Sequence, residues 1–432
     1  MIAYSPASSL GWLDLDAAAS ERVATLLRSL EEPDTLDELG LATVRDAFSA
    51  KLNPGTSTIQ TRLRYFIFLP WIFGRLEARR VEAGDFARRL RANEARLIDC
   101  LRHLGSGNGV IGFSAGRNLK RMPSAIYWGG LGSWGLRRLD LSIAEYGRRA
   151  AALGRQRPER DDDNEATAPA TAMWASLPPP PDDFLEADLT FDLTRDEALL
   201  LVDHIRRHRP CSLPAFCSAR PSPAGQAGFP WEVPTGGMPD RLVELLRHAR
   251  CFSELTLGPQ LVYNVLLARK ARAEFGWDTG EVEERQLGRL EDWAQLLEGR
   301  LGELRAWAED LPGFWHAVGV AGISGATTEF LNFVIRAGVD DPGGFAEDRQ
   351  VHERIARREI QLKSKRARLG NRAALETWSG LPGGGQLSYR WRITRNYLAE
   401  IARALGIDEA PVIHEPTAVP TPGVAAGRAA AR

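Results

Sequence analysis

Apolar and polar positions along most of the chain follow the spacing of amphipathic helices. Apolar residues three and four apart predict helices over residues 23–30 and 86–104. The stretch from Thr194 to Glu197 has the sequence of a capping box, in which a hydroxyl and a carboxylate accept the unpaired amides of a first helical turn. We expect the helix that it opens to end before Pro210. The pattern predicts a mainly α-helical protein with several multi-helix domains.

The longest apolar repeat lies between residues 287 and 311. Its members alternate spacings of three and four residues: Leu287, Leu290, Ala294, Leu297, Leu301, Leu304, Ala308 and Leu311. This is the a/d seam of a helix that packs along another helix and that Pro312 would end. Gly288, Gly299 and Gly302 weaken it as an isolated helix. We therefore expect it to pack within its own chain rather than in an intermolecular coiled coil.

One short stretch, "LSYRWRIT" at residues 387–394, alternates with the period of a β-strand. One face would carry Leu387, Tyr389, Trp391 and Ile393, and the other Arg390 and Arg392. Because this stretch follows a basic helix, it predicts the short strand or hairpin of a winged-helix-like element near the C-terminus. The alternative is an ordinary edge strand whose arginines discourage aggregation.

Two compositional breaks divide the chain. Residues 155–183 combine acidic residues with a run of four prolines, and the segment after residue 408 is rich in Ala, Pro and Gly. Neither can bury enough apolar surface to offset its ordering entropy. The expected parts are an N-terminal helical domain (8–154), an acidic linker (155–183), a middle helical region (184–275), a C-terminal helical domain (276–408) and a disordered tail (409–432).

Composition indicates a globular cytoplasmic protein. Of the 432 residues, 44% are apolar and 26% charged, which is typical of a folded domain. The longest apolar run, Tyr65 to Phe73, is about half of what a bilayer span needs. No signal peptide precedes the first predicted helix. The four cysteines form no CxxC pair, so we expect reduced thiols and a cytoplasmic location. Because the longest apolar run is too short to span a bilayer, we also expect no membrane contact.

The net charge of −1 hides an uneven distribution of charge. Residues 159–188 hold nine acidic residues against one arginine, which leaves an excess of seven positive charges elsewhere. Residues 62–121 hold thirteen basic residues against five acidic ones, and residues 354–372 hold eight against one. The second basic segment predicts a helix with a narrow apolar stripe and a positive surface, as a phosphate-binding helix needs.

This charge map selects the candidate phosphate contacts. The first choices are Arg357, Arg358, Lys363, Lys365, Arg366, Arg390 and Arg392. The second choices are Arg117, Lys120 and Arg121, which precede an aromatic helix expected over residues 122–139. That helix belongs either to the core or to a second unit that contacts nucleic acid. The alternative for both basic segments is a solvated face without a partner.

Catalytic and metal-binding motifs are weaker. Ser114 lies in Gly112-Phe113-Ser114-Ala115-Gly116, the pattern of a serine-hydrolase nucleophile, but the preceding helical pattern leaves no room for the parallel strands that such a site requires. The second weak motif combines two histidines and two cysteines, the residue types that bind zinc: His204, His208, Cys211 and Cys217. Arginines between them argue against a metal. We expect no metal and no cofactor.

Four segments resemble an uncharacterised bacterial family known only as a domain of unknown function. They are "SSLGWLDLD" (8–16), "RYFIFLPWIF" (64–73), "KRMPSAIYWGGLGSWGL" (120–136) and "YRWRITRNYL" (389–398). Members of that family tend to occur among phage-defence and DNA-modification genes, beside helicases and methyltransferases. The resemblance therefore implies a partner in a DNA-directed system, and it implies no catalytic residues.

These observations favour a non-enzymatic accessory protein that binds nucleic acid, most simply duplex DNA. The second hypothesis is a helical adaptor that docks onto partner proteins of a defence complex through the 287–311 seam and the apolar block at Tyr65 to Phe73. The third is a serine hydrolase that uses Ser114. Oligomeric state and target sequence do not follow from the sequence.

Overall fold

The computed structural model confirms a mainly α-helical fold. It describes residues 37–155, 173–219, 226–319, 322–378 and 384–407. Within these ranges, β structure is limited to one isolated bridge between Arg137 and Trp174. The helix predicted over residues 23–30 and the tail after residue 408 lie outside the described residues, as does most of the acidic linker.

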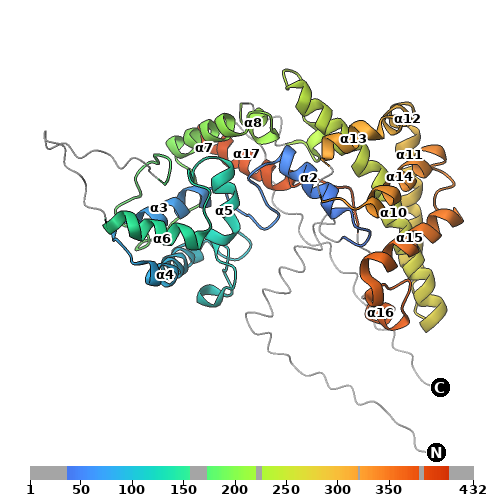
Figure 1. Ribbon diagram of the computed structural model, residues 1–432, viewed down its shortest axis with the longest axis horizontal. Coiled ribbons are helices and arrows are strands. Elements are labelled where there is room, and N and C mark those ends of the chain that lie inside the picture. Colours follow the sequence, from blue (N-terminus) through green and yellow to red (C-terminus); the bar gives the residue numbers. More distant parts are fainter. Residues whose placement is uncertain (1–36, 156–172, 220–225, 320–321, 379–383, 408–432) are drawn as a thin grey trace, which may run out of the picture.

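The helices pack around two hydrophobic cores at opposite ends of the molecule (Figure 1). We call the first the α4 lobe; its helices are α3 (Tyr65–Ala78), α4 (Ala83–Leu101), α5 (Pro123–Ser133), α6 (Ile143–Arg155) and α7 (Arg195–His208). We call the second the α10 lobe; its helices are α2 (Ala42–Leu52), α10 (Asp240–Phe275), α11 (Gly280–Glu298), α12 (Leu301–Glu309), α13 (Leu311–Val318), α14 (Gly325–Asp340), α15 (Arg349–Lys363) and α16 (Arg372–Glu376). Between the lobes lie α8 (Leu213–Ser218) and α17 (Trp391–Leu405).

The α4 lobe is organised around α3, whose apolar run is buried on every side. Each residue from Tyr65 to Phe73 is buried, so this block is core. Helix α5 approaches α3 closely because Gly130 has no side chain: a Cβ there would lie 2.8 Å from the ring of Phe66 on α3 and 2.5 Å from the carbonyl oxygen of Gly55. Trp134, just after α5, stacks on Phe66 with ring centroids 4.1 Å apart. The aromatic residues of the 122–139 segment therefore serve the core.

The α10 lobe is organised around the 36-residue helix α10. Helix α11 packs along it, as the apolar seam predicted. The expectation of one helix through residue 311 was wrong, because α11 ends at Glu298 and α12 begins at Leu301. The break falls at Gly299, one of the glycines that lower helical propensity. In the turn that follows, Arg300 pairs with the buried carboxylate of Glu254.

The predicted strand at residues 387–394 is wrong. Trp391 is the first residue of helix α17, and Tyr389 and Arg390 before it have left-handed backbone conformations with φ of 55° and 67°. The alternating apolar residues are buried as expected, but they enter two different cores. Leu387, Tyr389 and Trp391 pack in the α10 lobe, whereas Ile393 packs in the α4 lobe. The apolar spacing of two residues therefore arises from burial in two separate cores and not from a β-sheet. The winged-helix-like element is absent from the described residues.

The capping box at the start of α7 is confirmed. The Thr194 hydroxyl accepts the amide of Glu197 at 3.2 Å, and the Glu197 carboxylate accepts the amide of Thr194 at 2.8 Å. The same carboxylate pairs with Arg64 at 3.0 Å, which joins α7 to the start of α3. Helix α7 ends at His208, before Pro210.

Each of the two cores is built from segments that are not consecutive in the sequence. Of the predicted middle region, residues 184–205 pack in the α4 lobe and residues 242–271 in the α10 lobe. The proposed domain boundaries stay a prediction. Among the described helices, none combines the length and the apolar character that crossing a membrane requires.

The shared helix α17 makes a testable contribution to stability. Trp391→Ala removes a fully buried ring whose indole N–H donates to the carbonyl of Ala227 at 2.9 Å. We expect a loss of about 3–5 kcal/mol in the free energy of unfolding, measured by urea denaturation. The control is Leu199→Ala, whose side chain is 47% exposed and should change stability by less than about 0.5 kcal/mol. Equal losses in the two variants would contradict the assignment of Trp391 to the core.

Candidate nucleic-acid interface

The segment that contains Ser114 is a series of turns. Residues 111–115 are turns and η3 (Gly116–Asn118) is a short 3₁₀ helix. Gly112 has φ of 80°, and a Cβ there would lie 2.7 Å from the Leu119 side chain, so the turn itself accounts for this glycine. Ser114 is exposed. The strand, sharp turn and helix of a nucleophile elbow are not found among the described residues around it.

This segment lies along the exposed side of α4. The Arg91 guanidinium donates to the carbonyl oxygens of Arg117 and Leu119 at 2.9 and 2.7 Å. Near the end of α4, Arg102 and Arg117 both approach the carboxylate of Asp99, at 3.9 and 3.7 Å. These contacts hold the segment against the helix, so its cations and those of α4 form one surface.

We call this surface the α4 basic surface. It consists of the exposed cations of α4 and of the segments that follow it: Arg88, Arg89, Arg91, Arg96, Arg102, Arg117, Lys120 and Arg121. Two carboxylates pair with it: Asp85, which lies 2.8 Å from Arg88, and Asp99. Within the described part of the chain, no carboxylate pairs with the five remaining exposed cations: Arg89, Arg91, Arg96, Lys120 and Arg121. The surface is therefore strongly positive.

Only three members of this surface, Arg117, Lys120 and Arg121, were predicted from the sequence. The four arginines within α4 were counted in a basic region, but none was singled out. Their signal was present in the sequence, because Arg88, Arg89, Arg91 and Arg96 lie outside the apolar stripe that begins at Phe86. Helical periodicity places such residues on the face opposite the core.

The first-choice residues occupy two other places, so the structure does not bring the ten candidates together (Figure 1). Arg357, Lys365 and Arg366 are exposed on α15 and η5 (Ser364–Arg366) of the α10 lobe. Between the two lobes, directly before α17, Arg390 is half-buried and donates to the carbonyl of Thr56 at 2.9 Å. Arg392 is exposed in the first turn of α17.

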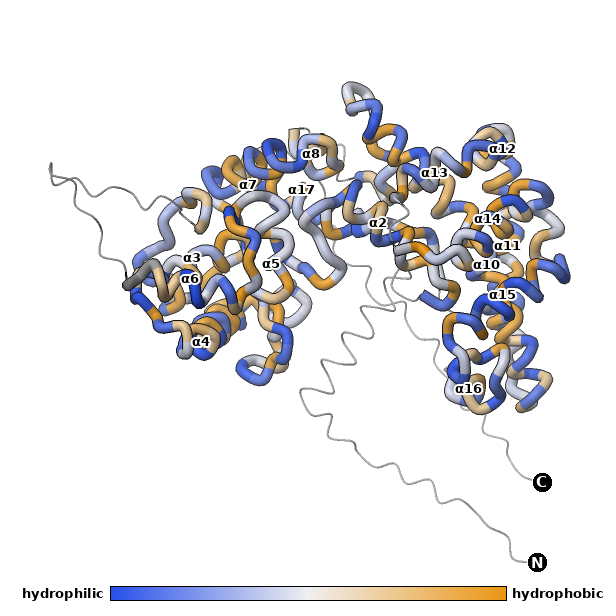
Figure 2. The backbone as a smooth tube through the Cα atoms, in the orientation of Figure 1, coloured by the Kyte–Doolittle hydropathy of each residue, from blue (hydrophilic) through white to orange (hydrophobic). Residues whose placement is uncertain are grey.

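Two first-choice cations are used inside the fold. Arg358 is only 3% exposed and donates to the Leu39 carbonyl and the Thr327 hydroxyl at 2.9 and 2.8 Å. Lys363 pairs with the carboxylates of Glu38 and Glu359. Although α15 is mostly hydrophilic in Figure 2, Lys363 is thus neutralised by carboxylates and Arg358 is withdrawn from the surface. The basic segment around α15 is a weaker surface than its sequence indicated.

The features that suggested an adaptor are internal. The apolar block from Tyr65 to Phe73 forms the core of the α4 lobe, and the 287–311 seam faces α10. Neither is available as a docking surface in this arrangement.

The histidine and cysteine motif is dispersed. His204 is buried, with its Nδ1 3.0 Å from the carbonyl oxygen of Trp134, and burial lowers its pKa. Cys217 is buried, whereas Cys211 is exposed. In the ranges that the structure covers, no three His, Cys, Asp or Glu side chains form a group that could hold a metal ion.

The fold and this surface define a helical protein of two lobes with a basic face on one of them. The chain belongs to a family of unknown function, DUF6361, which matches residues 7–405. No match was found among curated proteins or among solved structures. The resemblance noted in the sequence is therefore confirmed for the family and extends over both lobes.

A buried carboxylate lies beneath the α4 basic surface. Glu94, on the inner side of α4, is 1% exposed and accepts the amide of Ser124 at 2.6 Å, in the first turn of α5. The positive end of a helix favours an anion at this place. Burial nevertheless dominates and raises the pKa of Glu94 to about 7.

This raised pKa predicts the pH dependence of stability. The folded state holds the Glu94 proton more tightly than the unfolded chain between pH 4.5 and about 7, so stability falls as the pH rises through this window. Glu94→Gln removes the titration and keeps an acceptor for the Ser124 amide. We expect the variant to gain about 2 kcal/mol relative to the wild type between pH 5 and 8, measured by denaturant unfolding. A difference that does not change with pH would contradict this.

Proposed function

We propose that the protein binds the phosphate backbone of nucleic acid, most simply duplex DNA, through the α4 basic surface. The observation that supports this most is the set of exposed cations on α4 and residues 117–121 that no carboxylate of the described chain neutralises. When arginine and lysine side chains neutralise phosphates, they release the counterions condensed on the nucleic acid, and this release drives binding.

The chemistry of the cations suits phosphate. All but Lys120 are arginines, whose planar guanidinium binds a phosphate through two parallel hydrogen bonds. Several of them are already oriented by the fold: Arg91 by two carbonyl groups, and Arg102 and Arg117 by Asp99. Ordered side chains lose less conformational entropy when they bind.

The dimensions also suit a duplex. Helix α4 has 19 residues and is therefore about 28 Å long, close to the rise of one turn of DNA at about 34 Å. Basic residues occur from Arg88 in its second turn to Arg102 just after its end. Contacts to the backbone position a protein on DNA without specifying sequence, so we propose binding with little sequence preference.

The biological role is part of the same proposal. The chain would be a non-enzymatic accessory protein of a bacterial defence or DNA-modification system, as the family resemblance implied, and would hold DNA for a partner that acts on it.

The test removes two cations that have no carboxylate partner in the described part of the chain. In Lys120→Gln with Arg121→Gln, the slope of log affinity against log salt should become shallower by about 0.9 for each lost phosphate contact. The measurement is a fluorescence titration of a labelled duplex at several salt concentrations. The matched control is Arg305→Gln with Arg336→Gln, two exposed cations of the α10 lobe that also have no carboxylate partner within the described residues, and it should leave the slope unchanged.

Two results would refute the proposal. One is an absence of binding by the wild type at low salt, and the other is an equal loss in the test and control variants. Nuclease-resistant co-purification with partner proteins, together with either result, would favour the adaptor hypothesis.

A further inference from the structure

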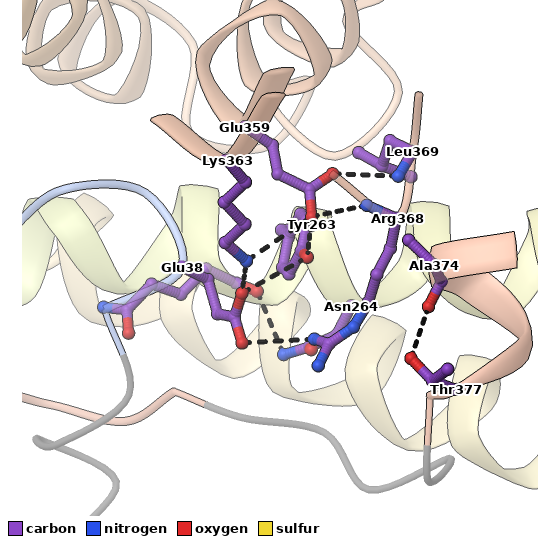
Figure 3. Close-up of polar contacts among 10 residues, drawn as sticks. Glu38, Tyr263, Asn264, Glu359, Lys363, Arg368, Leu369, Ala374 and Thr377 are labelled. Atoms are coloured by element: carbon purple, nitrogen blue, oxygen red, sulfur yellow. Dashed lines mark hydrogen bonds and ion pairs between the residues drawn. The ribbon is translucent and has the colours of Figure 1, made fainter. Parts of the chain in front are cut away.

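Five polar side chains meet where the N-terminal end of the described chain crosses α10 and α15 (Figure 3). We call them the Glu38 cluster: Glu38, Tyr263, Glu359, Lys363 and Arg368. Glu38 precedes α2, Tyr263 lies on α10, and the other three come from α15 and the segment after it. Three separate parts of the sequence therefore contribute to one charged site.

Glu359 is satisfied without Glu38. One of its oxygens accepts the Tyr263 hydroxyl at 2.6 Å and the amide of Arg368 at 2.9 Å, and the other accepts the amide of Leu369 at 2.8 Å. The side chain is fully buried. Glu359 is thus a permanent part of the fold, and it fixes the backbone that presents Arg368.

Glu38 is held differently. Its carboxylate pairs with the Lys363 ammonium and lies 3.1 Å from the Arg368 guanidinium, and its side chain is 20% exposed. The backbone beside it is held by other contacts, because Leu39 and Leu41 are buried and the Leu39 carbonyl accepts Arg358. The Glu38 side chain can therefore swing into solvent while the segment stays in place.

The charges indicate what would replace Glu38. With Glu38 present, two carboxylates balance Lys363 and Arg368. When Glu38 leaves, Glu359 is the one carboxylate left in the cluster. Asp37 also attracts Lys363, but the exposed cations Lys365 and Arg366 follow directly on η5, so the site remains positive. An ammonium and a guanidinium that converge on one oxyanion are the donors that bind phosphate.

We propose that Lys363 and Arg368 form a second phosphate-binding site, which Glu38 occupies and which a phosphate group of a polyanion takes over when the Glu38 side chain moves out. The choice of nucleic acid as the source of the phosphate rests on the proposed function; a free polyphosphate has the same chemistry. Glu38 is then an intramolecular competitor that weakens anion binding to the α10 lobe.

The test compares Glu38→Gln with Glu353→Gln. Both substitutions remove one negative charge near α15, but among the described residues Glu353 pairs only with the exposed Arg349, at 3.0 Å, and it lies outside the cluster. Inorganic pyrophosphate is the probe, and isothermal titration calorimetry measures its affinity. We expect Glu38→Gln to bind pyrophosphate about tenfold more tightly than Glu353→Gln and the wild type. Adding Lys363→Met to Glu38→Gln should abolish the gain.

Equal affinities in the two single variants would overturn the proposal, because they would show that Glu38 only holds the N-terminal segment. Circular dichroism checks that Glu38→Gln is folded. If it is not, Glu38→Asp keeps the charge but shortens the side chain, and a smaller gain than tenfold is expected; no gain there overturns the proposal as well.

A second arm distinguishes the sources of phosphate. The same variants are titrated with a labelled duplex in the background of Lys120→Gln and Arg121→Gln. A gain with pyrophosphate and duplex supports a phosphodiester ligand, and a gain with pyrophosphate alone supports a free polyphosphate. Failure of the wild type to bind DNA would refute the proposed function, but it would leave the pyrophosphate result valid.

Discussion

The two hydrophobic cores share one helix, α17. Because this helix connects the two lobes, it determines where the charged surface of each lobe lies. Trp391 and Leu398 of α17 pack in the α10 lobe, whereas Tyr397 and Ile401 pack in the α4 lobe. The buried carboxylate of Glu400, also on α17, pairs with Arg62 at 2.7 Å and so joins the helix to the start of α3. A helix that is apolar toward two sides cannot leave either core without exposing both.

The sequence predicted the elements whose causes are local. The capping box of α7 and the apolar stripe of α4 depend on residues within a few positions of one another, and both are confirmed. The start of α17 was missed because its apolar residues have the period of a strand, although the first three are buried in the α10 lobe and Ile393 is buried in the α4 lobe. The local sequence does not distinguish a β-strand from a segment that lies between two cores, because each of them buries every second side chain.

The same distinction explains the candidate site. Counting charges along the sequence favoured the segment around α15, where basic residues are densest. The carboxylates that neutralise it are distant: Glu329 pairs with Arg354, and Glu38 lies more than three hundred residues before Lys363. On α4 most of the cations are not paired with a carboxylate, because the nearest carboxylates are few and lie on the same helix. Because of these long-range ion pairs, the α4 basic surface keeps more unpaired positive charge than the segment around α15. This difference is visible in the folded structure and not in the sequence.

We propose that the α4 lobe, rather than the α10 lobe, provides the main surface for a polyanion. Hydrogen exchange measured by mass spectrometry, with and without a saturating duplex at low salt, tests it most directly. We expect slower exchange in peptides that cover residues 88–121, with a smaller change in those that cover residues 354–372. Protection confined to the second set, or protection nowhere, would contradict it.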